Sequence, residues 1–356
     1  MGSSKPLIVQ YNNVCWNGGT FGAAVDLARA LPEFRHKIMI KHDSINWIVK
    51  SRAERFGIEV GHLPQMTKKF LDHNNPYTLI MNNPGAGSYE AINPTDQFYD
   101  GYKWLMDYPI LTYHHSAVHP WFPTRSHIFC SNYLRLKYRN LWEKMDCMEI
   151  VPPCINTEDY SFKGLVPIHG RDDKLHIGIV MDKEEKKFPP KFVEQILEVL
   201  KPYRAVIQVD IVNGPFDCTD YDFVNRIPSL SDLINYFSDI DVFIHTPRIP
   251  DTWGRTLTEA IASGCYAIIA GEGGMHEQMF GNRYGYNLGV DEPIKELERW
   301  AGRFIETINK KPIRWFLNRG QSYIHAKSVG GYDLLRQRLI PILLRVHTGY
   351  RDVISV

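Results

Sequence analysis

The feature of this sequence that most constrains its fold is a regular alternation of short apolar runs with helical patterns, which starts twice. In the first half, we expect strands at 6–10, 36–40, 77–81, 109–113, 127–130 and 148–151. Helical patterns lie between them, at 20–31, 95–108 and 132–145. An alternation of this kind predicts a parallel sheet that is covered by helices on both faces.

The pattern begins again after a polar run that contains glycine and proline and ends near residue 174. Strands are expected at 175–180, 205–212, 242–245 and 266–270, with helices at 190–200, 230–238, 256–263, 295–308 and 333–346. The sequence therefore predicts two doubly wound α/β domains at 1–165 and 166–330. A C-terminal helix within 331–356 is expected to pack back on the first domain. Ligands bind beyond the carboxyl ends of parallel strands, so we expect the site in a cleft that the two domains face.

Composition excludes several classes of protein. A length of 356 residues agrees with two domains of about 100–200 residues each. Lys and Arg number 41 against 40 Asp and Glu, so no overall field attracts a polyanion. No apolar run reaches the roughly 18 residues of a membrane span, and the N-terminus lacks the apolar core of a signal peptide. The six cysteines form no C-x-x-C pair, and we expect a reduced, cytoplasmic setting.

The most informative segment is Asp251-Thr252-Trp253-Gly254-Arg255-Thr256-Leu257-Thr258-Glu259-Ala260, which follows a predicted strand and opens a helix. Gly254 carries no side chain where the helix begins, so the first amides, from Arg255 to Leu257, can approach a ligand. These amides and the helix dipole form a site suited to a diphosphate. Asp251 and Glu259 can then reach separate hydroxyl groups of one extended ligand. A capping carboxylate and a solvated helical Glu are the structural alternative.

A second glycine turn follows the next strand, and here the sequence resembles a known family. Asp251-x7-Glu259, Ala262-Ser263-Gly264 and Gly273-Gly274-x-x-Glu277 together look like the motif of retaining GT-B glycosyltransferases, glycosyltransferase family 4. The resemblance covers most of the chain. It includes Asn17-Gly18-Gly19-Thr20 before the first helix, Val151-Pro152-Pro153-Cys154-Ile155-Asn156 at the domain crossing, and Lys187 before Phe188-Pro189-Pro190.

The resemblance implies a role for each matching residue. Asp251 would bind hydroxyl groups of the donor sugar, Glu259 the ribose of the nucleotide, and Lys187 a phosphate. The segment Gly254, Arg255, Thr256 and Leu257 would meet the sugar and diphosphate. The remaining implied contacts are His115, or its neighbour His114, beside the sugar, and Gly18 and Gly19 near the diphosphate and acceptor.

The sequence departs from the family's pattern at two positions, 251 and 179. Asp251 replaces the family's Glu and is one methylene shorter, which changes the sugar that fits. Ile179 follows Gly178 where the family usually has Arg. Lys183 and Lys186 could replace this Arg, although lysines at 182–187 are also typical of a solvated loop. We expect Lys187 to be the phosphate ligand.

The resemblance implies a retaining enzyme that moves a hexose or related sugar from a nucleotide-diphosphate sugar to an acceptor hydroxyl. A glycan or lipid-linked saccharide is the expected acceptor. A helix N-terminus and a Lys stabilise a departing diphosphate electrostatically, so no metal and no cofactor are expected. Two Asp-x-Asp sequences, at 220–222 and 239–241, are better explained as solvated turn carboxylates than as metal ligands.

Several alternatives stay open from the sequence. The acceptor could be a protein or a modified DNA base, or the chain could bind a nucleotide sugar without transferring it, as an epimerase does. Gly18-Gly19-x-x-Gly22 with Asp43 faintly resembles a dinucleotide fold, but the G-x-G-x-x-G order is absent. The helix from Asn132 interleaves aromatic and basic residues. This pattern is better explained by a solvated face than by nucleic acid, which is not indicated, or by a peripheral membrane contact.

Overall fold

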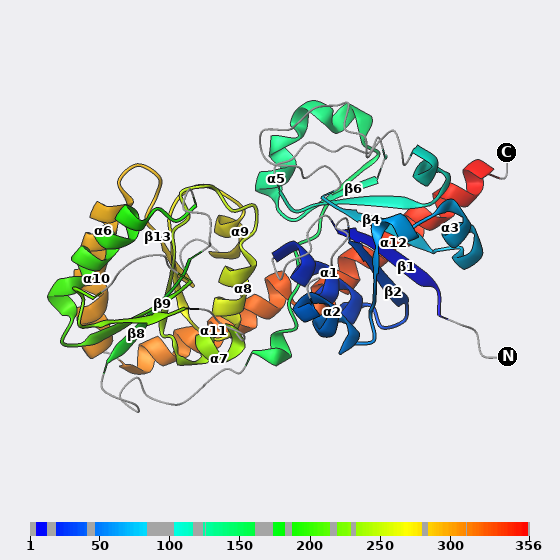
Figure 1. Cartoon of the computed structure of the whole chain (residues 1–356). Helices are drawn as coiled ribbons and strands as arrows, with labels where there is room; N and C mark the ends of the chain where they lie inside the picture. The colour runs from blue at the N-terminus through cyan, green and yellow to red at the C-terminus, as the bar shows by residue number, and fades with distance from the viewer. Residues whose placement is uncertain are drawn as a thin grey trace. The chain divides into compact units, whose positions relative to one another are not determined.

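The chain forms two compact units in the computed structural model, which describes residues 5–12, 19–40, 47–83, 103–116, 124, 126–160, 174–181, 187–213, 219–228, 233–279, 284–310 and 312–354 (Figure 1). Unit 1 comprises Met1–Asn156 and Gly330–Val356, and unit 2 comprises Thr157–Val329. Each unit has its own sheet. The chain thus leaves unit 1, completes unit 2, and returns to unit 1 with its last helix.

Unit 1 is built on a parallel sheet, whose seven strands in the described part of the chain run in the order β3-β2-β1-β4-β5-β6-β7. Both faces of the central strands are covered, so β1 and β4 are buried at every position. This is why most of their residues are apolar, with Gln10, Asn12, Thr78 and Asn82 as buried polar exceptions. The strands are β1 (Leu7–Asn12), β2 (Arg35–Ile40), β3 (Glu59–His62), β4 (Thr78–Asn82), β5 (Ile110–His114), β6 (Ser126–Phe129) and β7 (Cys147–Ile150).

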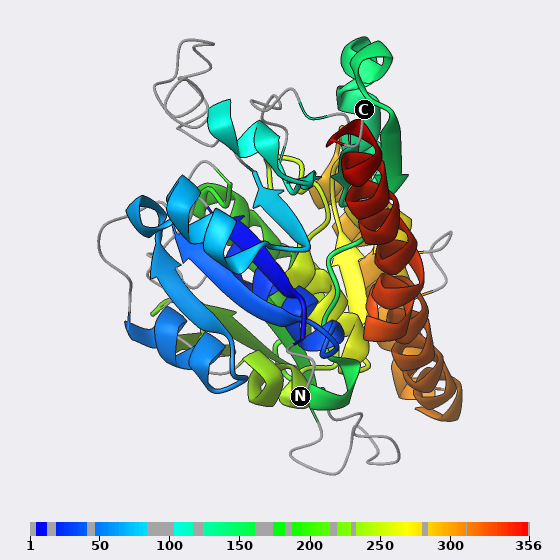
Figure 2. The ribbon, with the colours of Figure 1, turned by 90° about the vertical axis from the view of Figure 1, so that its right-hand side faces the viewer.

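The helices of unit 1 come from both ends of the chain. They are α1 (Gly19–Ala30), α2 (Trp47–Glu54), α3 (Lys68–Asn74), α5 (Asn132–Lys137) and the long C-terminal α12 (Tyr332–Ile354), with 3₁₀ turns η1 (Leu63–Gln65), η2 (Lys103–Asp107) and η3 (Arg139–Lys144). A further 3₁₀ turn, η4 (Thr157–Asp159), belongs to unit 2. Helix α12, red in Figure 2, packs against α1, β4 and β5. The Tyr332 hydroxyl donates to Asp26 at 2.8 Å, and the Arg336 guanidinium donates to Glu33 at 2.8 Å.

Unit 2 repeats the architecture with a parallel sheet, of six strands within its described ranges, in the order β10-β9-β8-β11-β12-β13. Its strands are β8 (Leu175–Val180), β9 (Ile207–Val212), β10 (Val224–Ile227), β11 (Val242–His245), β12 (Tyr266–Ile269) and β13 (Gly285–Asn287). Its helices are α6 (Pro190–Leu200), α7 (Leu233–Asp239), α8 (Arg255–Ala262), α9 (Met275–Met279), α10 (Pro293–Lys310) and α11 (Pro312–Gly330), with the 3₁₀ turn η6 (Lys201–Tyr203). The predicted parallel α/β architecture is confirmed in both units.

Two predicted helices differ from the structure. Of the range 95–108, the structure describes 103–108, where the chain forms the 3₁₀ turn η2, and residues 84–102 lie outside the described ranges. Pro109 ends this turn, because a residue that precedes proline avoids the α conformation. The helix predicted at 132–145 leaves α geometry at Tyr138 and continues as η3. Tyr138 is 2% exposed and packs against Phe129 and His114, and this burial takes precedence over regular helix geometry.

The sequence analysis missed three strands, β3, β10 and β13, and each lies at an edge of its sheet. These strands are short and partly exposed, so their sequences lack the apolar run that marks a central strand. Helices α2 and α3 were also not predicted. They have eight and seven residues, shorter than the usual span of a helical hydrophobic pattern.

Candidate functional site

A group of three polar side chains in unit 2 lies at the point where the sheet changes its winding direction. Strands β8 and β11 are neighbours but are not consecutive in the chain, so the connections from their carboxyl ends diverge. Ligands of open α/β sheets bind at such a switch point. Lys187 follows β8, His245 ends β11, and Asp251 lies in the loop after β11. We refer to Lys187, His245 and Asp251 as the Asp251 cluster.

Contacts within the Asp251 cluster engage both carboxylate oxygens of Asp251. Lys187 Nζ lies 2.7 Å from Oδ1, and His245 Nε2 lies 2.9 Å from Oδ2. A carboxylate only accepts hydrogen bonds, so His245 donates from Nε2. Burial alone would raise the pKa of Asp251, but the hydrogen bond from His245 and the charges of His245 and Lys187 lower it to about 2. Asp251 is therefore an anion at neutral pH and serves as an acceptor of hydrogen bonds.

A glycine turn joins the Asp251 cluster to helix α8. Gly254 is the N-cap of α8 and has a φ of +77°, in the left-handed region that favours glycine. A Cβ at this position would lie 3.0 Å from Cγ of Met275. The second glycine motif packs against the same loop, since a Cβ at Gly273 would clash with the Asp251 carbonyl oxygen. The structure thus brings the two predicted glycine turns together.

A buried polar network holds this turn from behind. The Trp253 indole donates to the Thr258 hydroxyl at 3.1 Å, and that hydroxyl donates to the Gln278 side-chain oxygen at 2.7 Å. The Gln278 amide donates to the carbonyl oxygens of Trp253 and Gly254. Gln278 is fully buried, so water cannot replace these bonds. The network fixes the direction in which α8 presents its first turn.

The residues of α8 that were predicted to bind the donor differ in burial and in their hydrogen-bond partners. Glu259 is 7% exposed, and its carboxylate lies 3.3 Å from the Arg255 guanidinium, one helical turn earlier. The Leu257 amide already donates to the Gly254 carbonyl at 2.9 Å, and the Leu257 side chain is buried in the core. The amide that α8 offers to an anion therefore belongs to the very start of the helix, where Thr256 lies.

In unit 1, the predicted histidines separate into one at the sheet edge and one in the core. His115 directly follows β5 and is half-buried, and its Nε2 lies 3.0 Å from Oδ1 of Asn82. His114 is 2% exposed, contacts Nδ1 of His127 at 2.9 Å and stacks on Phe129. Burial lowers the pKa of His114 well below the usual value for histidine, with further contributions from His127 and His115. Of the two, His115 has the more accessible imidazole.

Of the other predicted site residues, those that the structure describes show no contact that supports a binding role. Gly19 is the exposed first residue of α1, and a Cβ there would meet no atom within 4 Å, so packing does not require glycine. Gly18 and Lys183 lie outside the described residues. Ile179, at the family's Arg position, is 2% exposed within the hydrophobic core of unit 2.

Sequence reasoning missed two residues that shape the site, His245 and Gln278. The available signal for His245 was its position as the last residue of a predicted strand, where side chains of doubly wound sheets meet ligands. Gln278 had no such signal. It is a polar residue on the short helix α9, and only the tertiary structure shows that it holds the Gly254 turn.

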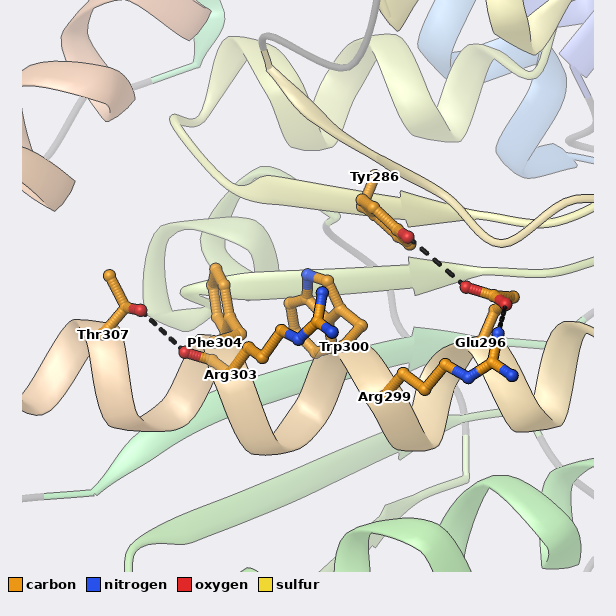
Figure 3. Close-up of a pocket in the computed structure, with 7 residues that line it drawn as sticks. All are labelled: Tyr286, Glu296, Arg299, Trp300, Arg303, Phe304 and Thr307. Atoms are coloured by element: carbon orange, nitrogen blue, oxygen red, sulfur yellow. Dashed lines mark hydrogen bonds and ion pairs between the residues drawn. The ribbon is translucent and has the colours of Figure 1, made fainter.

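Unit 2 also has a surface pocket of about 450 Å³ on the side of helix α10 (Figure 3). Trp300 and Phe304 stack with their ring centroids 4.1 Å apart, and the Tyr286 hydroxyl donates to Glu296 at 3.5 Å. The remaining lining residues are Arg299, Arg303 and Thr307. None of the predicted site residues lines this pocket, and it contains no glycine turn or helix N-terminus, so we place the candidate site at the Asp251 cluster.

Neither a membrane-spanning helix nor a metal-binding group of side chains occurs within the described residues. No helix there is both long enough and apolar enough to cross a membrane. In the same part of the chain, no three His, Cys, Asp or Glu side chains gather as they would around a metal ion. Asp241, from the second Asp-x-Asp sequence, accepts a hydrogen bond from the His176 amide at 2.9 Å and so stabilises the start of β8.

Comparison with known proteins gives a clear answer for the fold. No protein-family model and no curated protein sequence matches the chain. Solved structures do: a glycosyltransferase from Rickettsia africae ESF-5 has 12% identity and a TM-score of 0.71, and the match covers 97% of this chain and 99% of that chain. HepE of Anabaena, in complex with UDP and glucose, has 13% identity and a TM-score of 0.70, with 95% and 99% covered.

Sucrose-phosphate synthase from Thermosynechococcus elongatus is a third similar structure, with 12% identity and a TM-score of 0.61 over 98% of this chain and 99% of that chain. At such identities the likeness shows the fold alone. The chain therefore has the fold of the GT-B glycosyltransferases, with two Rossmann-like units, as the sequence predicted.

Proposed function

We propose that this protein is a glycosyltransferase that takes its sugar from a nucleotide-diphosphate donor. The observation that carries the proposal is the Asp251 cluster at the switch point of unit 2, directly before the N-terminus of α8. Two features support it. Solved structures with the same fold include HepE bound to UDP-glucose, and the spacing of Asp251 and Glu259 resembles glycosyltransferase family 4.

In the proposed complex, Asp251 accepts hydrogen bonds from hydroxyl groups of the donor sugar, and Glu259 accepts those of the ribose. The start of α8 and Lys187 stabilise the diphosphate, whose negative charge increases as the sugar–phosphate bond breaks. Donors that are already in position cost little reorganisation when this charge develops. Lys187 pairs with Asp251 at 2.7 Å in the structure, so it neutralises the sugar-binding carboxylate and the phosphate from one position.

We further propose that transfer retains the anomeric configuration of the sugar. The acceptor hydroxyl attacks the anomeric carbon from the face that the diphosphate leaves, the carbon–oxygen bond to phosphate breaks, and the acceptor proton passes to the departing phosphate oxygen. Asp251 is unsuited to act as a nucleophile because Lys187 and His245 stabilise its negative charge. In this proposal, His115 contacts the donor sugar, and that sugar is a hexose. The acceptor is a glycan or a lipid-linked saccharide, and the transfer needs no metal ion.

Two substitutions test the assignment of the donor site. Asp251→Asn and Glu259→Gln remove one charge each and keep the shape of the side chain. Each variant should lower kcat/KM by about 100-fold, as the loss of one preorganised polar contact does in other enzymes. Glu194→Gln, an exposed carboxylate of the same unit, is the matched control and should leave the rate unchanged. Wild-type rates in Asp251→Asn, with the correct donor, would refute the site.

Slow hydrolysis of the donor tests the stereochemistry without an acceptor. If the transfer retains configuration, proton NMR should show an α-linked donor releasing the α-anomer of the free sugar first. Release of the β-anomer would contradict retention.

The same reaction with and without EDTA tests metal independence, and we expect equal rates.

A further inference from the structure

A chain of buried amide groups links the carboxyl ends of β1, β4 and β5 in unit 1. The Gln10 side-chain amide donates to the Ala24 carbonyl at 2.9 Å. The Asn82 amide donates to the Tyr11 carbonyl at 3.1 Å and to the Gln10 side-chain oxygen at 3.4 Å. Oδ1 of Asn82 then faces Nε2 of His115 at 3.0 Å. The chain thus runs from a backbone carbonyl on α1 to an imidazole at the sheet edge.

The direction of these hydrogen bonds is fixed by the backbone. Carbonyl oxygens only accept, so the groups that face Ala24 and Tyr11 must be the NH₂ groups of Gln10 and Asn82. Rotating the Asn82 amide by half a turn would place its oxygen against the Tyr11 carbonyl, so that two acceptors would face each other. Gln10 and Asn82 are both 0% exposed, so no water can relieve such a contact. Asn82 therefore turns its oxygen, an acceptor, toward His115.

The position of the His115 ring is held independently of this bond. The backbone amide of His115 donates to Oδ1 of Asn83 at 2.7 Å, and the imidazole lies against the Tyr113 ring with centroids 3.9 Å apart. A half-turn of the ring about the Cβ–Cγ bond would exchange Nε2 with Cε1, so it would bring no other nitrogen to Asn82. A nitrogen that faces an acceptor must carry the proton.

We propose that Asn82 is a positioning residue that holds neutral His115 in the tautomer protonated on Nε2. Nδ1 is then the hydrogen-bond acceptor of this imidazole, and a group that binds there has to be a donor. A sugar hydroxyl fits this requirement, whereas a phosphate or carboxylate oxygen does not. The tautomer follows from unit 1 alone, and only the step from Nδ1 to a sugar hydroxyl rests on the proposed function.

The tautomer can be measured in the full-length protein without any substrate. The experiment uses ¹⁵N-histidine labelling and long-range ¹H–¹⁵N correlation spectra at neutral pH, with the His115 signals assigned by their loss in His115→Gln. We expect the Nε2-protonated form to exceed the other tautomer by about tenfold or more, as a buried hydrogen bond would require. A larger population protonated on Nδ1 would overturn the proposal.

Two variants separate the role of Asn82 from a general effect on the fold. Asn82→Leu removes the acceptor and should reduce the tautomer ratio of His115 by about tenfold. Thr112→Val removes a different buried hydrogen bond of the same sheet, 2.8 Å to Thr124, and should leave the His115 ratio unchanged. Unchanged His114 signals in Asn82→Leu show that the sheet is intact. An unchanged His115 ratio in that variant would refute the role of Asn82.

Once a donor has been identified, kinetics test the step to the ligand. Asn82→Leu should lower the rate of transfer about tenfold with a donor whose sugar has the hydroxyl that meets His115. It should have little effect with the corresponding deoxy-sugar donor, and equal losses with both donors would refute this step. Because the spectra need no substrate, absence of glycosyl transfer would refute the proposed function and leave the tautomer assignment standing.

Discussion

The carboxylate of Asp251 lies between a lysine and a histidine, and these neighbours determine how the side chain responds to acid. Its pKa in the folded protein is about 2, below the 3.8 of an ordinary aspartate, so the folded state holds the anion more strongly. A shift of this size stabilises the fold by about 2 kcal/mol. This contribution is complete above about pH 4 and is lost as the pH falls toward about 2.

Chemical denaturation of wild type and Asp251→Asn over this range tests the acid response. The difference in unfolding free energy between the two proteins should be larger at about pH 5 than at about pH 3, because the wild type loses its advantage as Asp251 is protonated. Glu194→Gln should follow the wild type. A difference that does not change with pH would contradict the lowered pKa.

The buried histidines of unit 1 respond to acid at a higher pH than Asp251 does. Burial lowers the pKa of His114 well below 6.5, and it lowers the pKa of His127 even though the Thr124 carbonyl opposes this. Because the unfolded chain binds these protons more readily, stability should decrease as the pH falls below about 6.5. His114→Leu should show a smaller loss between about pH 7.5 and 5.5 in urea unfolding. Equal losses in both proteins would show that His114 does not titrate as described.

Residues of the candidate site differ in how far the sequence reveals them. Asp251 and Glu259 were predicted because they flank a glycine at the start of a helix and because their spacing resembles the motif of glycosyltransferase family 4. The sequence left His114 and His115 as alternatives, since only the sheet shows which imidazole faces the core. Asn82 and Gln278 were not predicted, because a polar residue that positions another across the fold leaves no local pattern.

Among the secondary-structure elements, α8 depends most on a single residue, Gly254. In Gly254→Ala, the φ of +77° costs about 1–2 kcal/mol, and the new Cβ also presses on Met275 and displaces the first turn. We expect nucleotide affinity to fall at least about tenfold, measured by calorimetric titration. Gly289→Ala is a matched control, since Gly289 has the same φ and a Cβ there meets no atom within 4 Å. It should lose similar stability but keep its affinity.

Elements at the centre of a sheet were predicted better than those at its edges. Strands β8 and β11 have the bounds that the sequence predicted, because burial on both faces requires a continuous apolar run. The edge strands β3 and β13 contain polar residues and glycine and were missed. The break after α5 also could not be predicted, since the burial of Tyr138 depends on residues from other strands.

At the scale of the whole molecule, unit 1 is completed by the last segment of the chain. Four aliphatic side chains of α12 are almost fully buried, namely Leu335, Leu339, Ile342 and Leu343. Each contributes about 1.5–3 kcal/mol, and their sum is comparable to the total stability of a typical domain. Removal of residues 330–356 should therefore unfold unit 1 while unit 2 stays folded.

Circular dichroism and one-dimensional NMR of the truncated protein test this dependence. The signals of His114 and His127 should lose their dispersion, and those of unit 2 should persist. Retention of native His114 signals would show that α12 is dispensable.

The full chain covers almost the whole length of glycosyltransferases that share only 12–13% of its residues, so the fold depends on patterns of burial rather than on particular side chains.

Above all, we propose that a nucleotide sugar binds at the start of α8. The most direct test of this binding is thermal unfolding of the wild type, Glu259→Gln and Glu194→Gln with UDP, GDP, ADP, TDP and their sugars. One donor should raise the Tm of the wild type, with about 2.7 kcal/mol of stabilisation at a concentration 100 times Kd. Glu259→Gln should lose most of this shift, and Glu194→Gln should retain it. If no nucleotide raises the Tm, or if Glu259→Gln responds as the wild type does, the claim is wrong.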